Sequence, residues 1–300
     1  MFSFERSKLT KSTAPKSIRA IFAVLIAACL FGTSASARAL AEIEVDSIAI
    51  AFIRLFIGAV GLLFISLYFE DSRTVLRMVR LPVVWAMSIG IASYQYFFFV
   101  GTDLVGVALG TLISLALAPF FAGILGWMWK GSKPGVVWFL STVTAVIGLT
   151  LISFYALNSS IPIGGVIAAL LASLAYASYT VLGSESAEKT SAIGLLAVAF
   201  ALASLILLPF SITRLSFLST SDGLLLSFWL GVIATALAYA FFAYGLPRLK
   251  AGVIATLNLA EPLVATILGV VILGEQLGAL AVVGCVLIAI ALSQLALSHR

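Results

Sequence analysis

Ten long apolar segments dominate this chain, and they limit what it can fold into. Each is close to the length of about 20 residues that a helix needs to cross the hydrocarbon core of a bilayer. The chain is 62% hydrophobic and only 10% charged, whereas a soluble domain carries about 25% charged residues. The sequence therefore predicts an all-α integral membrane protein with ten transmembrane helices. The predicted spans are residues 18–37, 47–69, 81–101, 107–129, 135–156, 161–182, 191–210, 222–246, 252–274 and 277–297.

The positive charges indicate how these spans are oriented. Cytoplasmic loops of membrane proteins are enriched in Lys and Arg. If the N-terminus is placed in the cytoplasm, fourteen of the seventeen Lys and Arg residues fall in cytoplasmic segments. Only Arg38 and Arg214 fall on the opposite side, and Arg54 lies inside the second span. This asymmetry predicts that both termini are cytoplasmic and that residues 1–17 form a basic cytoplasmic tail. We therefore interpret the net charge of +5 as a topology signal and expect no nucleic-acid partner.

The N-terminus has an alternative interpretation. The basic stretch, the apolar run from Ile18 to Phe31 and the small residues Ala35-Ser36-Ala37 also resemble a cleaved secretory signal peptide. Cleavage would leave nine spans, and it would destroy an internal repeat of the chain by removing its first span. We expect the first span to be retained for that reason.

The second half of the chain repeats a pattern of the first half. Because each half holds five spans, an odd number, the second half enters the membrane from the opposite side. We therefore predict two inverted five-helix repeats, residues 18–156 and residues 157–300, the second ending in a short cytoplasmic C-terminus. Inverted repeats are typical of secondary transporters, whose binding site lies near the midplane between the halves, although channels also use them. The recurring residues are Pro119, Ala122, Ile124-Leu125-Gly126 and Gly131, matched 143 positions later by Pro262, Ala265, Ile267-Leu268-Gly269 and Gly274; Tyr96 and Tyr239 at the same offset; and Phe31-Gly32 with Tyr176-Ala177 at 145.

Two such repeats, each with a proline-centred helix followed by a stripe of small residues, resemble the drug/metabolite transporter superfamily in its ten-span, EamA-type branch. Residues 261–265 and 273–277 closely match the second-repeat pattern of that branch, and Arg54-Leu55 is similar to an arginine of its first repeat. The resemblance covers residues 18–297. The chain departs from it at Ser132, where the first repeat often carries a glutamate. The resemblance implies a multi-pass exporter in the cytoplasmic (inner) membrane of a bacterium.

Pro119 and Pro262 fall near the middle of their predicted spans. Proline lacks a backbone N–H, so each one leaves the carbonyl four residues earlier without its usual helical partner. These carbonyls belong to Leu115 and Asn258. Symmetric kinks of this kind are candidate hinges for helices that open one side of the membrane and then the other. The alternative is a static kink that only shapes the packing.

Small residues follow each proline at the spacing of one helical turn. Ala122 with Gly126, and Ala265 with Gly269, place two small side chains on one helix face. Small residues let the backbones of neighbouring membrane helices approach closely. We therefore expect these four residues to serve helix packing.

Glu261 is the most unusual residue, because it is a carboxylate at the centre of a span. Its insertion costs about 2.5–3.5 kcal/mol, so such a group usually faces protein or a wet cavity. It could bind protons or a substrate amine in alternation. It could instead be a structural acceptor, bonded to Asn258 three residues earlier or paired with Arg54 of the second span.

Several aromatic and polar side chains also lie well inside the predicted spans. Aromatic rings with hydroxyl tips suit a cavity for metabolites with apolar side chains, or for organic cations through cation–π contacts. For any one residue, a position in the core or against lipid is at least as common. The candidate substrate-binding residues are Tyr94, Gln95, Tyr176, Tyr179, Tyr239, Asn258 and Glu261, with Arg54 as a coupling or ion-pair residue.

These features predict a secondary transporter that exports small metabolites, above all amino acids with apolar or aromatic side chains. The alternatives are a multidrug or quaternary-cation exporter and, more remotely, a passive channel or a membrane enzyme. An enzyme is disfavoured because the single histidine, His299, and the two cysteines offer no metal or hydrolase cluster. No phosphate-binding loop is present, so we expect no cofactor and no ATP-binding partner. The expected partners are the substrate and the lipid bilayer, and the oligomeric state stays open.

Overall fold

The computed structural model describes residues 14–131, 133–154 and 162–298, and these residues are helical or in short connections. The basic tail predicted over residues 1–17 lies largely outside the described residues, as do Ser132 and the predicted junction between residues 156 and 157. Within the described part, nine helical segments are long and apolar enough to cross a membrane, and one apolar helix is shorter, at 17 residues. The structure is thus all-helical as predicted, and the count of ten spans stays a prediction.

Seven of the apolar segments are single helices. Three are divided into shorter helices within one segment, and three short helices lie in the connections. The single helices are α1 (Ala14–Leu40), α2 (Ser47–Phe69), α4 (Pro82–Val105), α7 (Val136–Ile152), α8 (Ile163–Ser186), α9 (Ala192–Ser211) and α14 (Ala279–Leu297); the divided segments are α5 (Val107–Ala116) with α6 (Ala118–Lys130), α10 (Ser221–Phe228) with the π-helix η4 (Trp229–Leu237) and α11 (Ala238–Gly245), and α12 (Ala251–Leu257) with α13 (Ala260–Leu273); the connecting helices are α3 (Ser72–Met78), η2 (Ile212–Arg214) and η3 (Ser216–Ser219).

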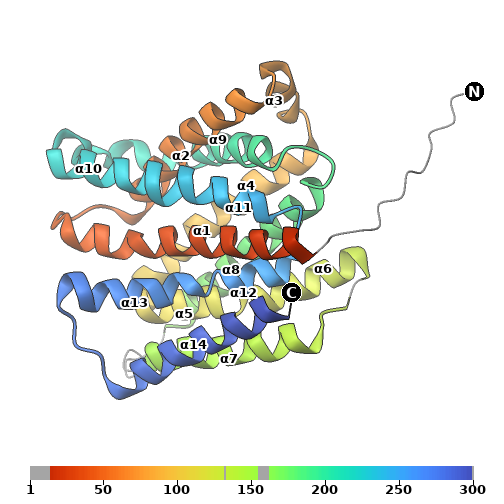
Figure 1. The fold of residues 1–300 in the computed structure, drawn as a ribbon. Helices are drawn as coiled ribbons and strands as arrows, with labels where there is room; N and C mark the ends of the chain where they lie inside the picture. The colour runs from red at the N-terminus through yellow and green to blue at the C-terminus, as the bar shows by residue number, and fades with distance from the viewer. Residues whose placement is uncertain (1–13, 132, 155–161, 299–300) are drawn as a thin grey trace, which may run out of the picture.

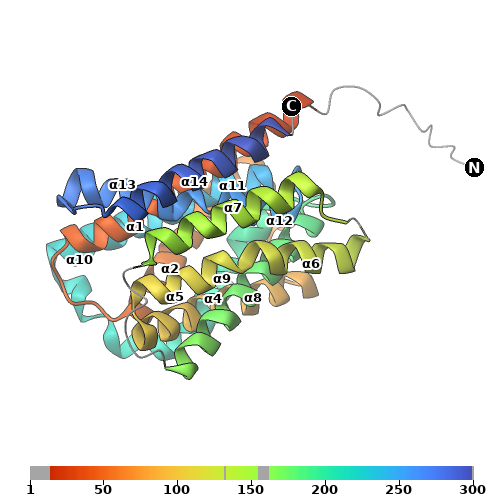
Figure 2. The same cartoon turned by 90° about the horizontal axis from the view of Figure 1, so that it is seen from below.

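The helices pack into one bundle in which elements from both halves of the chain lie side by side. Figure 1 shows α1 crossing the bundle between α10 and α11 on one side and α12 and α13 on the other. Helices α7 and α14 lie next to each other at one edge, as both views show (Figures 1 and 2). The start of α1 and the end of α14 lie at the same end of the bundle (Figures 1 and 2).

Contacts between helices match when the two halves are exchanged. Helix α1 packs along α13 and α11, and α8, which has the same place in the second half, packs along α6 and α4. Exchanging the halves also replaces α2 by α9 and α7 by α14, so the contacts of α2 with α9 and of α7 with α14 are unchanged by the exchange. Two inverted repeats would produce this arrangement. The repeat itself stays a prediction.

Both prolines follow a break in the helix, and neither lies in a kink within a continuous helix. Pro119 stands in the first turn of α6, and Pro262 stands in the first turn of α13. In a first turn the missing N–H costs nothing, because no helical carbonyl requires it. The carbonyl of Asn258 is without its usual helical partner, as predicted, because that position is Pro262; it accepts the backbone N–H of Glu261 at 2.9 Å instead. The breaks are potential hinges, and whether they move stays a prediction.

The small residues after the prolines do not all make the close helix contacts that we expected. A methyl group built onto Gly126 would have no neighbour within 4 Å among the described residues. Gly269 is buried, but its nearest neighbour is the carboxylate of Glu275 in the loop that follows α13. Ala122 is buried and Ala265 is half-buried. The sequence pattern was therefore misleading at Gly126, because a small residue permits a close approach without producing one.

The closest helix contacts lie at other glycines. A methyl group built onto Gly32 of α1 would lie 2.7 Å from the carbonyl oxygen of Glu261, in the first turn of α13. A methyl group on Gly148 of α7 would lie 2.6 Å from the carbonyl oxygen of Gly284 in α14. Only glycine permits such distances between backbones. The contact at Gly32 therefore places α1 directly against the break between α12 and α13.

Candidate functional site

A small cavity lies where α1, α2, α4, α5, α8, η4 and α11 surround the break between α12 and α13. Its volume is about 60 Å³, which is room for a few water molecules. Side chains from both halves of the chain form its wall. The lining residues are Phe31, Arg54, Leu55, Ile91, Tyr94, Gln95, Phe98, Leu115, Tyr176, Tyr179, Thr235, Tyr239, Asn258 and Glu261.

All eight residues proposed from the sequence for substrate binding or ion pairing line this one cavity. They come from five different segments of the chain, which lie far apart in the sequence. The prolines and the small packing residues are not among the lining residues. The fold therefore gathers the candidate residues into one place, and their roles in transport stay predictions.

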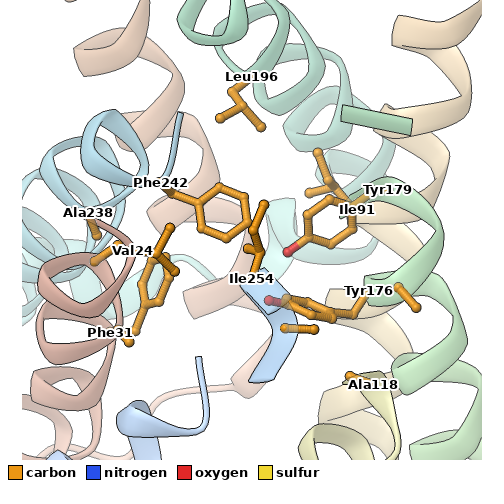
Figure 3. Close-up of a cluster of buried hydrophobic side chains, with 14 of the residues drawn as sticks. Val24, Phe31, Ile91, Ala118, Tyr176, Tyr179, Leu196, Ala238, Phe242 and Ile254 are labelled. Carbon is orange, nitrogen blue, oxygen red and sulfur yellow. The ribbon is translucent and has the colours of Figure 1, made fainter. Parts of the chain in front are cut away.

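Tyrosine side chains form one wall of the cavity. Tyr94 of α4 lies against Tyr176 of α8, with ring centroids 5.6 Å apart, and Tyr176 and Tyr179 are 5.3 Å apart. The hydroxyl groups of Tyr179 and Tyr239 share a hydrogen bond of 3.1 Å. Figure 3 shows the hydroxyls of Tyr176 and Tyr179 pointing away from α8, toward the side where Phe31 projects from α1. The wall therefore offers apolar ring faces with polar tips.

Asn258 and Glu261 reach the cavity because the helix is broken between α12 and α13. Asn258 is buried, and its amide nitrogen donates a hydrogen bond to the hydroxyl of Tyr176. Its side-chain oxygen is also buried and has no hydrogen-bond partner among the described residues. Glu261 is half-buried in the first turn of α13, where the positive end of the helix dipole favours a negative charge. An acceptor without a partner and a carboxylate thus meet at the break.

Arg54 supplies the opposite charge from α2. Its Nε donates a long hydrogen bond of 3.4 Å to the hydroxyl of Thr235 in the π-helix η4. Arg54 acts electrostatically on Glu261, but among the described residues no ion pair within 4 Å joins them. Asn258 donates to Tyr176 and makes no side-chain bond to Glu261 in the same residues. Among the described residues, therefore, neither structural partner that we considered is hydrogen-bonded or ion-paired with the Glu261 carboxylate.

Six lining residues were not proposed from the sequence as site residues: the polar Thr235 and the apolar Phe31, Leu55, Ile91, Phe98 and Leu115. Thr235 is a polar side chain in an apolar segment, and this is the criterion that selected Asn258. It lies in the π-helix η4, which no sequence pattern indicated. Phe31 was noted in the sequence only because the pair Phe31-Gly32 recurs in the second half of the chain. The repeat match of Tyr96 with Tyr239 is misleading here, because Tyr96 is 37% exposed on the outside and Tyr94 lines the cavity.

Two larger hollows lie away from these residues. One, of about 320 Å³, lies between the ends of α6, α7, α12 and α14; the other, of about 530 Å³, lies between α1, α10 and α13. Both have mainly apolar walls. The described residues contain no group of His, Cys, Asp or Glu side chains that could hold a metal ion. The central cavity is therefore the place where opposite charges, unpaired polar atoms and aromatic faces coincide, and it is the candidate site.

The bond between Asn258 and Tyr176 gives a prediction about stability. Replacing Tyr176 with phenylalanine should destabilise the protein by about 1–3 kcal/mol, because the buried amide then loses its partner. Thermal unfolding in detergent would measure the loss. Tyr96→Phe is the matched control, since the ring of Tyr96 lies outside the cavity against Phe97 and Phe210. Equal stability of both variants and the wild type would show that this bond contributes nothing.

An internal cavity lined by ionisable and aromatic side chains, within a bundle of membrane helices, is typical of membrane transporters. The sequence pattern of the EamA-like transporter family matches residues 18–154 and, a second time, residues 163–296. The chain therefore belongs to the EamA-like transporter family, and it is a multi-pass membrane transporter.

Relatives support the family and leave the substrate open. The chain is 34% identical over 255 residues to the uncharacterized transporter YwfM of Bacillus subtilis, covering 85% of this chain and 86% of that one. It is 28% identical over 269 residues to the uncharacterized protein PA1977 of Pseudomonas aeruginosa, covering 86% and 87%. A solved crystal structure has a TM-score of 0.80 at 19% identity, over 94% of this chain and 97% of that chain, which shows that the fold is shared.

Proposed function

We propose that this transporter exports small metabolites, above all amino acids with apolar or aromatic side chains, across the cytoplasmic membrane of a bacterium. The carrying observation is the central cavity, which is lined by Tyr94 and Arg54 from the first half and by Tyr176 and Glu261 from the second. Its rings suit an apolar side chain, and its polar atoms suit the charged groups of an amino acid. In its sequence pattern of two proline-centred repeats, the chain most resembles the bacterial amino-acid exporter YddG.

The proposed mechanism is alternating access around this cavity. Ten spans in two inverted repeats, with both termini in the cytoplasm, would rock against each other and expose the cavity to each side in turn. A volume of about 60 Å³ is far below the roughly 300–1,000 Å³ of an ordinary ligand pocket, so the side chains must separate before a substrate enters. The helix breaks before Pro119 and Pro262 are the proposed hinges. The energy would come from a gradient of substrate or of protons.

Each candidate residue has a proposed role. Glu261 would bind the ammonium group of the substrate or a proton, in alternation, since a carboxylate can accept either. The free side-chain oxygen of Asn258 would accept a further hydrogen bond from the ammonium. The substrate side chain would lie against the aromatic wall. The residues of this wall are Tyr94, Tyr176, Tyr179 and Tyr239, with Gln95 as a polar contact.

One observation favours a second candidate, the export of organic or quaternary cations. A carboxylate beside several tyrosine rings is also what a cation-binding cavity needs, since the ring faces attract positive charge. In that case Glu261 would be the counter-charge of the substrate. The two candidates differ in whether the substrate needs a carboxylate of its own.

Counterflow in proteoliposomes tests the proposal. The purified full-length protein would be reconstituted and loaded with one unlabelled compound at a time, from a panel of amino acids and organic cations. Uptake of the labelled compound would be measured at two pH values. We expect saturable counterflow with apolar and aromatic amino acids. Counterflow with cations alone would favour the second candidate, and uptake that does not saturate would point to a channel.

A further inference from the structure

Arg54 has more hydrogen-bonding capacity than its surroundings use. A guanidinium group carries five N–H donors. Among the described residues, the hydrogen bond from its Nε to Thr235 is the contact that holds it, and no ion pair within 4 Å engages it. Arg54 is nevertheless half-buried within a membrane-spanning helix and lines the central cavity. A guanidinium in this position is costly unless a partner compensates it.

Local structure fixes the guanidinium by its inner nitrogen. Thr235 is fully buried and donates its own hydrogen to the carbonyl of Leu230, five residues earlier, at 2.7 Å. Its oxygen is then left to accept from Arg54. Gly58, one turn after Arg54 on α2, brings the helices together, since a methyl group built there would lie 3.0 Å from Cβ of Thr235. Holding Nε leaves the two terminal nitrogens free, and these form part of the fork that binds a carboxylate through two bonds.

The cavity thus presents two opposite charges that form no ion pair within 4 Å among the described residues. Arg54 comes from the first half of the chain and Glu261 from the second, and both line the same space. A ligand with one positive and one negative group could engage both. A ligand with only a positive group would be attracted by Glu261 and repelled by Arg54, and such like-charge contacts are strongly unfavourable.

We propose that Arg54, positioned by Thr235, is the binding site for the carboxylate of a zwitterionic substrate. This inference rests on the proposed function, because it takes the central cavity as the transport site. It separates the two candidate functions by chemistry: the substrate is a small molecule that carries both an ammonium and a carboxylate. Glu261 and Asn258 bind the ammonium end, and the tyrosine wall lies beside the side chain.

A pair of compounds that differ only in the carboxylate tests this site. Phenylalanine and phenylalaninamide have the same ring and amine, but the amide has no carboxylate. We expect the wild type in proteoliposomes to prefer phenylalanine at least tenfold in counterflow. Arg54→Gln should raise KM for phenylalanine at least tenfold. It should also speed transport of the amide, because the repulsion between Arg54 and the lone ammonium is removed, so the preference should collapse. Arg54→Lys should restore part of it.

Thr235→Val supplies a second, milder variant in case Arg54→Gln does not fold. It removes the bond to Nε and should lower the preference for phenylalanine severalfold through KM, with kcat little changed. Thr150→Val is the matched control, because Thr150 makes the same kind of bond to its own helix, to the carbonyl of Val146, away from the cavity. An unchanged preference in folded Thr235→Val would overturn the positioning role.

The outcomes separate this inference from the proposed function. If the wild type transports both compounds equally well, the proposed carboxylate site is contradicted, while the proposal that the protein transports amines is supported. If Arg54→Gln is folded and slows both compounds equally, Arg54 serves the Glu261 charge or the packing, and the carboxylate site is again wrong. If the wild type carries neither compound, nor any amino acid of the panel, the proposed function fails and the carboxylate site fails with it.

Discussion

Replacing Glu261 with glutamine is expected to reduce amino-acid counterflow about 10- to 100-fold while the protein remains folded. The side chains have nearly the same shape, and the carboxylate has no protein partner within hydrogen-bonding distance in the described residues, so little packing is lost. What would be lost is the proposed charge-assisted hydrogen bond to the substrate ammonium, worth about 1.5–3 kcal/mol. Because about 1.4 kcal/mol corresponds to a tenfold change in an equilibrium constant, this range of free energies gives the expected reduction in counterflow.

The same variant tests proton coupling. A carboxyl group can take up and release a proton, whereas a carboxamide cannot, so Glu261→Gln should also flatten any response of transport to pH. Glu275→Gln is the matched control, since Glu275 is exposed in the loop after α13 and lies outside the cavity. A folded Glu261→Gln protein with wild-type counterflow and an unchanged pH response would exclude both roles of the carboxylate.

The second large effect is expected at Gly32, where valine should destabilise the bundle. A methyl group at this position would already lie 2.7 Å from the carbonyl oxygen of Glu261 and 2.9 Å from Cβ of Val264. Neither neighbour can turn away easily, because one is backbone and the other is the first carbon of a side chain. Overpacking of this kind costs about 1–3 kcal/mol. Helix α1 would have to move from α13, and the yield of monodisperse protein in detergent should fall.

Gly126→Val provides the comparison for this experiment. It makes the same change in another membrane helix, but a methyl group at Gly126 has no neighbour within 4 Å in the described part of the chain. Its yield and its thermal unfolding should therefore stay close to those of the wild type. If Gly32→Val does fold, its transport should be impaired, because α1 would displace the turn that carries Glu261. Similar behaviour of the two variants would mean that the contact at Gly32 is not tight in the membrane.

The residues that line the candidate site could be selected from the sequence because they carry chemistry that is rare in apolar segments; their roles in transport stay predictions. Glu261, Asn258 and Arg54 stood out since a polar side chain inside a span is costly, and this cost does not depend on the details of the fold. The tyrosines stood out for a similar reason. The family resemblance was also visible in the sequence, because the proline and the residues around it recur in both halves.

The remaining features could not be predicted because they leave the hydrophobic pattern unchanged. The segment that contains η4 is as apolar as an ordinary α-helix, so nothing indicated a π-helix or the position of Thr235. A proline indicates a disturbed helix, but it does not distinguish a kink from a break one turn earlier. The contact between Gly32 and Glu261 joins residues far apart in the sequence, and it depends on how α1 crosses α13.

The placement of Arg54 and Glu261 on different halves of the chain would have a consequence for the kinetics of the proposed alternating-access cycle. In the proposed cycle, the empty halves would rock through a closed state in which water does not screen Arg54 and Glu261. These two side chains form no ion pair within 4 Å among the described residues, so the closed state would be a barrier to reorientation. A zwitterion between them would satisfy both charges and lower that barrier. The loaded carrier would then reorient faster than the unloaded one. Such a protein would exchange one molecule for another more rapidly than it completes a net outward turnover, and the difference would grow with the strength of both charge contacts.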